Sequence, residues 1–259
     1  MFNKKLLILY FLLIAIILVP LSVNAFWGLA NKTISAISKN IKVLPDDEII
    51  RLSKLSDEIK GTTKVGKELG KLNLPDNVLE DTFLRIAIYQ KIITREAAEG
   101  MFSRLSGIPG FRPSLRKLIG NSDIGTAGHL NELKIADIAS LSSFKVLGIG
   151  EKFIDGIKKS PTDIDILLKK GNKIFAIEAK AYAKISKISM DKYRADLNTL
   201  IAYQNNMDDI VPVFTITNKP DNFHYLKTLK LEAGKRDVQL IFGSPQEQIE
   251  QIKMLGEIL

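Results

Sequence analysis

The sequence predicts an α/β protein with a mixed central sheet flanked by helices and an N-terminal helical subdomain. Three observations support this fold class. Residues 46–90 repeat apolar side chains at helical spacing, residues 107–128 are rich in Gly and Pro, and beyond them short strand-like apolar runs alternate with helical segments. Of the 259 residues, 46% are apolar and 25% are charged, which supports one substantial core and excludes a disordered or fibrous chain.

Residues 1–25 have the three parts of a secretory signal peptide. Two lysines precede a continuous apolar run, Leu6–Val19, and small or modest side chains lead up to Ala25. The run is too short to span a bilayer core of about 30 Å comfortably. The sequence therefore predicts cleavage before Phe26 and a secreted or periplasmic protein. The alternative is an uncleaved membrane anchor formed by residues 6–25.

The region 26–105 is predicted to be a helical subdomain. A Pro-Asp-Asp sequence at 45–47 begins one helix and a Leu-Pro-Asp sequence at 74–76 begins another, because proline and acidic residues favour a first helical turn. Residues 106–127 hold Gly and Pro at short intervals, which is typical of a linker, here around one short basic helix at 114–119.

The region 128–259 has the alternation of strands and helices that is typical of an α/β domain. In chain order, the sequence predicts a helix at 129–142, strands at 145–149, 163–168 and 174–179, a helix at 190–204, a strand at 211–217, a helix at 222–233, a strand at 238–242 and a C-terminal helix.

Charge and cysteine content limit the classes of partner and metal. Lys and Arg number 37 against 29 acids, and the net charge of +8 favours a polyanionic partner such as nucleic acid or an anionic membrane. The chain has no cysteine, which excludes disulfides, zinc-thiolate sites and thiol nucleophiles. Its two histidines, His129 and His224, are far apart in sequence and are interpreted as structural or surface residues. A hard cation bound by oxygen ligands is therefore favoured.

Two predicted strands carry the residues that indicate chemistry. Asp163 and Asp165 share one face of the first strand, and Glu178 and Lys180 share one face of the next. The connection is short enough for a hairpin, which would bring Asp165 beside Glu178. Paired carboxylates suit Mg²⁺, and a neighbouring lysine can orient or acidify a water that attacks a phosphate. Each charge alone could be solvated, but an apolar strand before Glu178 favours a site.

These strands resemble the PD-(D/E)XK, or restriction-endonuclease-like, nuclease superfamily. Its pattern is an acid at the start of one strand, a hairpin, and (D/E)-x-K on the next strand, often after a helix that carries a glutamate. Here the second strand ends in Glu178-Ala179-Lys180, and Pro161 is not adjacent to an acid, which leaves Asp163 or Asp165 as the metal-binding acid. Asp165 is preferred because it directly precedes the apolar pair Ile166-Leu167, as the aspartate of the family usually does. The resemblance implies that Asp165, Glu178 and the Ala179 carbonyl hold Mg²⁺ or Mn²⁺. It also implies that Lys180 assists the attacking water.

Further residues are predicted around this centre. Glu132 lies on the face of the helix at 129–142 that carries small side chains, which can approach the sheet closely. The resemblance implies that it orients the water or adds a second metal ligand, and the alternative is a side chain that reaches solvent. Asp163 and Gln204 would be auxiliary, with a polar helix end as the alternative for Gln204. The basic residues predicted to contact nucleic acid, unless they are a solvated helix face, are Lys184, Lys187, Lys192 and Arg194.

Together these features predict an exported, Mg²⁺-dependent endonuclease that hydrolyses phosphodiester bonds of DNA or RNA. The resemblance makes a toxin or effector one expectation, with an immunity protein as its partner. The first alternative is a catalytically inactive nuclease-fold module that binds nucleic acid or a protein. The second is a membrane-anchored protein whose basic surface faces anionic lipid.

Overall fold

The computed structural model describes residues 43–58, 64–71, 74–153, 162–183 and 186–258. The predicted signal peptide, Pro161 and Lys184 lie outside these residues. Within the described ranges, no helix has both the length and the apolar character needed to cross a bilayer.

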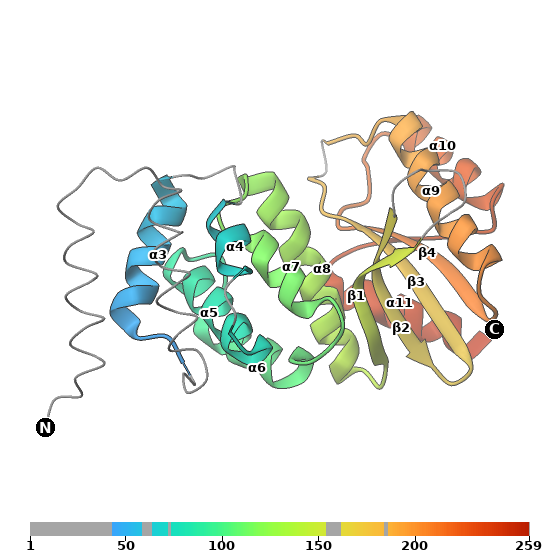
Figure 1. Cartoon of the computed structure of the whole chain (residues 1–259). Helices are drawn as coiled ribbons and strands as arrows, with labels where there is room; N and C mark the ends of the chain where they lie inside the picture. Colours follow the sequence, from blue (N-terminus) through green and yellow to red (C-terminus); the bar gives the residue numbers. More distant parts are fainter. Residues whose placement is uncertain (1–42, 59–63, 72–73, 154–161, 184–185, 259) are drawn as a thin grey trace, which may run out of the picture.

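Helices make up the first half of the described chain, and an α/β arrangement follows (Figure 1). The helices before the sheet are α3 (Asp46–Glu58), α4 (Lys64–Leu69), α5 (Asp76–Tyr89), α6 (Arg95–Leu105), α7 (Phe111–Leu118) and α8 (Asp123–Leu141). The remaining elements are β1 (Lys145–Phe153), β2 (Thr162–Lys170), β3 (Lys173–Lys180), α9 (Met190–Asn205), β4 (Ile210–Ile216), α10 (Phe223–Gly234), β5 (Gln239–Phe242) and α11 (Pro245–Ile258).

The five strands form one mixed sheet in the order β1-β2-β3-β4-β5. β1, β2 and β3 pair antiparallel, whereas β3, β4 and β5 pair parallel. The parallel pairs are joined by crossovers through α9 and α10, as parallel strands require. The predicted α/β class, with a mixed sheet and flanking helices, is therefore confirmed.

Helices cover both faces of the sheet (Figure 1). Side chains of α8 and α11 join one buried cluster with Phe175 and Ile177 of β3. Side chains of α9 and α10 join a second cluster with Ala176 of β3 and Phe214 of β4. The first cluster continues into α3–α7 through residues such as Leu115. The helical half and the sheet consequently share one hydrophobic core.

Residues 106–127 form packed structure rather than the predicted linker. They contain α7 and the first turn of α8, and both Phe111 and Leu115 are fully buried. Gly110 has a φ of +84°, and a Cβ there would lie 1.6 Å from the carbonyl oxygen of Ile149 in β1. Only glycine allows so close a backbone approach. Gly110 is therefore required for close packing against the sheet. A glycine in a flexible linker would look the same in the sequence.

Candidate functional site

The predicted acids and lysine lie where β2 and β3 separate. The ladder between these strands ends at Ile166 opposite Ile177, while β2 stays paired with β1 and β3 with β4. Beyond this point, Oδ2 of Asp165 accepts a hydrogen bond from the backbone N–H of Ala179 at 2.8 Å. A side-chain carboxylate thus replaces a backbone acceptor. The sheet opens into a fork, and its two arms carry Asp165 and Glu178.

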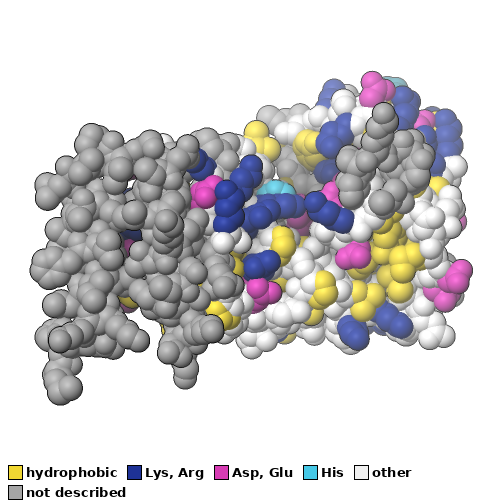
Figure 2. Space-filling model, in the orientation of Figure 1, with side chains coloured by type: hydrophobic (Ala, Val, Ile, Leu, Met, Phe, Trp, Pro, Cys, Tyr) yellow, Lys and Arg dark blue, Asp and Glu magenta, His cyan; other side chains and the backbone are white. Residues whose placement is uncertain are grey.

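A pocket of about 310 Å³ occupies this fork. Helices from both faces reach it because the sheet is open here. The lining residues are Lys117, His129, Glu132, Thr162, Asp163, Asp165, Glu178, Lys180, Lys192, Asp196 and Thr199. Figure 2 shows basic and acidic side chains and a histidine close together near the middle of the face that it draws. The four predicted catalytic residues, Asp165, Glu178, Lys180 and Glu132, therefore line one pocket.

Lys180 lies between two carboxylates. Its Nζ forms an ion pair with Oε1 of Glu178 and lies 3.3 Å from Oδ2 of Asp196 on α9. The same Asp196 oxygen is 3.5 Å from Nζ of Lys192. The side chains of Lys180, Glu178 and Asp196 are only 15%, 9% and 17% exposed, so these charges are largely withdrawn from water.

Asp196 is a site residue that the sequence did not indicate. It follows Lys192 by one helical turn, and such a pair normally indicates a solvated helix face. In the structure this turn of α9 packs over the fork. The buried Oδ2 of Asp196 lies close to the ammonium groups of both Lys180 and Lys192, so its charge is offset inside the protein.

Glu132 enters the pocket from α8 together with His129. Nδ1 of His129 lies 3.1 and 3.2 Å from the two carboxylate oxygens of Glu132, one helical turn away. Glu132 is 7% exposed, and the imidazole gives this buried acid a polar partner. His129, which sequence reasoning assigned to structure or surface, therefore lies at the pocket. The His-x-x-Glu spacing was the one signal that could have indicated this.

Burial and repulsion by nearby carboxylates raise the pKa of both acids of the fork. Burial is the main cause for Glu178, whose pKa rises to about 7 despite the opposing charge of Lys180. The pKa of Asp165 lies well above its ordinary value because of burial first and then the charges of Glu178 and Glu132. Burial lowers the pKa of Lys180, but its carboxylate neighbours outweigh this effect and raise it overall. Lys180 consequently stays charged, and the acids would gain from a further cation.

The raised pKa of Glu178 makes the stability of the metal-free protein dependent on pH. Folding raises the pKa of Glu178 from 4.5 to about 7, so the folded state binds this proton more tightly between those values. The resulting stabilisation is present below about pH 4.5 and is lost as the pH rises through 7. In EDTA at pH 8, Glu178→Gln is expected to raise the free energy of unfolding by roughly 1–3 kcal/mol, and at pH 5 the gain should be much smaller.

Urea denaturation at the two pH values measures this difference. Glu99→Gln, which removes an exposed carboxylate 3.9 Å from Arg95 on α6, is the matched control and should show no comparable change. Equal effects of the two variants at pH 8 would contradict the assigned burial of Glu178.

The two auxiliary residues lie in different places. Asp163 lines the pocket near Asp165 on β2. Gln204 does not line it: its Nε2 donates a hydrogen bond to the carbonyl oxygen of Ile210 at 3.1 Å. Gln204 stands in the last turn of α9, where it ties the helix to the start of β4.

The predicted basic residues are also dispersed. Lys192 lines the pocket. Arg194 instead forms a 3.0 Å ion pair with Glu232 of α10, and Nζ of Lys187 lies 5.8 Å from the centroid of an aromatic ring on α10. Lys184 lies outside the described residues. The described lysines and the arginine of this stretch therefore do not form a continuous basic surface.

The oxygen donors of the fork suit a hard cation. Asp165 and Glu178 present carboxylates from adjacent strand ends, and the N–H of Ala179 fixes the orientation of Asp165. The described ranges contain no group of three or more His, Asp or Glu side chains close enough to enclose a metal. The residues of the fork therefore fit a metal site with two carboxylate ligands, in which waters complete the coordination, as is usual for Mg²⁺.

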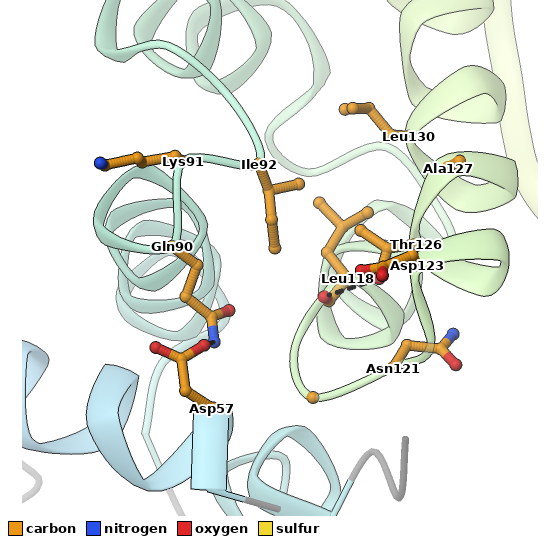
Figure 3. Close-up of a pocket in the computed structure, with 11 residues that line it drawn as sticks. Asp57, Gln90, Lys91, Ile92, Leu118, Asn121, Asp123, Thr126, Ala127 and Leu130 are labelled. Carbon is orange, nitrogen blue, oxygen red and sulfur yellow. Dashed lines mark hydrogen bonds between the residues drawn. The ribbon is translucent and has the colours of Figure 1, made fainter. Parts of the chain in front are cut away.

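A second pocket, of about 320 Å³, lies among the helices (Figure 3). Apolar side chains such as Ile92 and Leu118 form part of its wall. At one edge, Nε2 of Gln90 donates to Oδ1 of Asp57 at 2.7 Å, and Figure 3 shows the ammonium of Lys91 directed away from the cavity. This pocket lacks the buried ion cluster of the fork, which is the stronger candidate site.

Comparisons with protein-family models, curated proteins and solved structures found no match to this chain. Its function must therefore be inferred from its own residues. The most informative are those of the fork, where two strands and two helices bring acids and a buried lysine together.

Proposed function

We propose that this protein is a metal-dependent nuclease that hydrolyses phosphodiester bonds of DNA or RNA. The observation that carries the proposal is the convergence of Asp165, Glu178 and Lys180 in one pocket. The order α8-β1-β2-β3 adds support. It places a helix with a glutamate before a strand with an acid, a hairpin and a strand that ends in Glu-x-Lys, which is the pattern of the PD-(D/E)XK resemblance.

Asp165 and Glu178 would hold Mg²⁺ or Mn²⁺, with the Ala179 carbonyl as a further ligand. When bound, the ion would offset the negative charge of the phosphate and lower the pKa of a coordinated water. Both acids favour such an ion because burial and neighbouring carboxylates disfavour their charged forms, and a bound cation would offset this.

Lys180 acts as a charged hydrogen-bond donor in this proposal. Its raised pKa keeps it protonated, so it is unsuited to remove a proton from water. Its ammonium can orient the attacking water and stabilise the charge that develops on the phosphate. Asp196 and Glu178 hold it at this position.

Glu132 is suited to receive the proton of the water. Its carboxylate lines the pocket from α8 and is oriented by His129. As the water oxygen forms its bond to phosphorus, the bond to the leaving oxygen breaks, and that oxygen takes a proton from solvent. Asp163 would be auxiliary in positioning the water network.

Incubation of the purified protein with plasmid DNA and with RNA tests this function. We expect cleavage in Mg²⁺ or Mn²⁺ and none in excess EDTA. Cleavage that persists in EDTA would contradict the proposed chemistry. Binding without cleavage under all metal conditions would favour the catalytically inactive module instead.

We further infer that residues 1–25 export the protein, which suits a secreted toxin or effector with a cognate immunity protein. N-terminal sequencing after expression and cell fractionation tests this. A secreted or periplasmic product that begins at Phe26 is expected, whereas a membrane-bound product that begins at Met1 would favour the anchor.

A further inference from the structure

Lys117 lines the acidic pocket of the fork but pairs with none of its acids. The other cationic or ionisable basic groups of the wall, Lys180, Lys192 and His129, each contact a carboxylate. Within the described ranges, Lys117 has no ion pair, although five carboxylates line the same pocket. Its three N–H donors therefore remain available to a ligand.

The fold places Lys117 at this wall rather than leaving it on a mobile chain. Lys117 belongs to the last turn of α7, between the buried residues Leu115 and Leu118 that fix the opposite side of the helix in the core. The side-chain amide of Asn121 donates to the carbonyl oxygen of Lys117 at 3.2 Å and stabilises the end of the helix. Lys117 itself is half-buried. A half-buried ammonium without a partner favours an anionic ligand.

We propose that Lys117 binds the phosphate next to the scissile phosphate, so that α7 forms one wall of the substrate site. This inference rests on the proposed nuclease function and specifies its substrate class. The acids of the fork and Lys180 act on one phosphodiester, and Lys117 holds a second. The substrate is therefore a polynucleotide, and an ester with a single phosphate cannot use this contact.

Two substrates separate the role of Lys117 from that of the fork. For a short oligonucleotide, Lys117→Ala is expected to lower kcat/KM about tenfold, mainly through KM, because the lost contact contributes to binding. For bis(p-nitrophenyl) phosphate, which has one phosphodiester, the same variant should match the wild type. Lys230→Ala removes an exposed lysine of α10 outside the pocket and is the matched charge control.

Binding gives a second readout that does not require cleavage. With a fluorescent oligonucleotide in EDTA, the slope of log Kd against log salt should fall by about one for Lys117→Ala and clearly less for Lys230→Ala. If the wild type cleaves nucleic acid but the two variants behave alike in both assays, the role of Lys117 is wrong and the nuclease function stands. If the wild type cleaves nothing, the nuclease function fails, and the binding difference alone supports or overturns the Lys117 contact.

Discussion

Glu178→Gln is expected to reduce the rate of nucleic-acid cleavage by about 10³-fold while the protein becomes more stable at pH 8. The amide keeps the shape of the side chain but removes one of the two charged oxygen donors of the fork. It also removes a buried negative charge, which accounts for the gain in stability. The measurement is the initial rate on plasmid or oligonucleotide at saturating Mg²⁺, together with urea denaturation of the same preparations at pH 8 in EDTA.

The opposite signs of these two effects make the prediction specific. A purely structural role for Glu178 would lower activity only through loss of folded protein, and stability would fall with it. The control Glu99→Gln should keep full activity. A stable Glu178→Gln variant that retained more than about a tenth of the wild-type rate would contradict the assignment of Glu178 to the site.

Phe111→Ala is expected to lower the free energy of unfolding by about 3–5 kcal/mol. Phe111 is fully buried in α7, and its cluster includes side chains from both the helical half and the sheet. Truncation leaves a cavity at the junction of these two parts, so both should lose stability together. Chemical denaturation followed by circular dichroism measures the loss, and hydrogen exchange reports where protection falls.

Phe223→Ala provides the matched control because Phe223, on α10, is 71% exposed. Its truncation should change stability by roughly 0.5 kcal/mol or less. Loss of protection confined to residues 46–105 in Phe111→Ala, with the sheet unaffected, would show that the helical half is an independent unit and would contradict a shared core.

Much of the sheet could be predicted from local patterns in the sequence. The apolar runs at 163–168 and 174–179 and the helix at 190–204 match β2, β3 and α9 closely, because each element has a clear periodicity. The stretch 106–127 could not be predicted in this way. Gly110 allows close approach to β1, and that requirement depends on a neighbour distant in sequence.

The site was predictable only where its residues share neighbouring strands. Asp165 and Glu178 follow from the period of two and the short hairpin. Asp196, His129 and Lys117 come from three different helices, and no local spacing relates them to the strands. Their sequence surroundings are those of ordinary helix faces. Gln204 is the opposite case. The sequence predicted its helix, α9, but the residue lies in the last turn, where its amide donates to a backbone carbonyl instead of reaching the pocket.

Calorimetric titration with Mn²⁺ tests most directly whether the opened strand ends form a cation site. The wild type should bind Mn²⁺, and its affinity should increase as the pH rises through about 7, because the ion displaces the proton held by Glu178. Asp165→Asn and Glu178→Gln should each abolish this binding, whereas Glu99→Gln should preserve it. Absence of binding by the wild type, or equal binding by all four proteins, would contradict the proposed metal site.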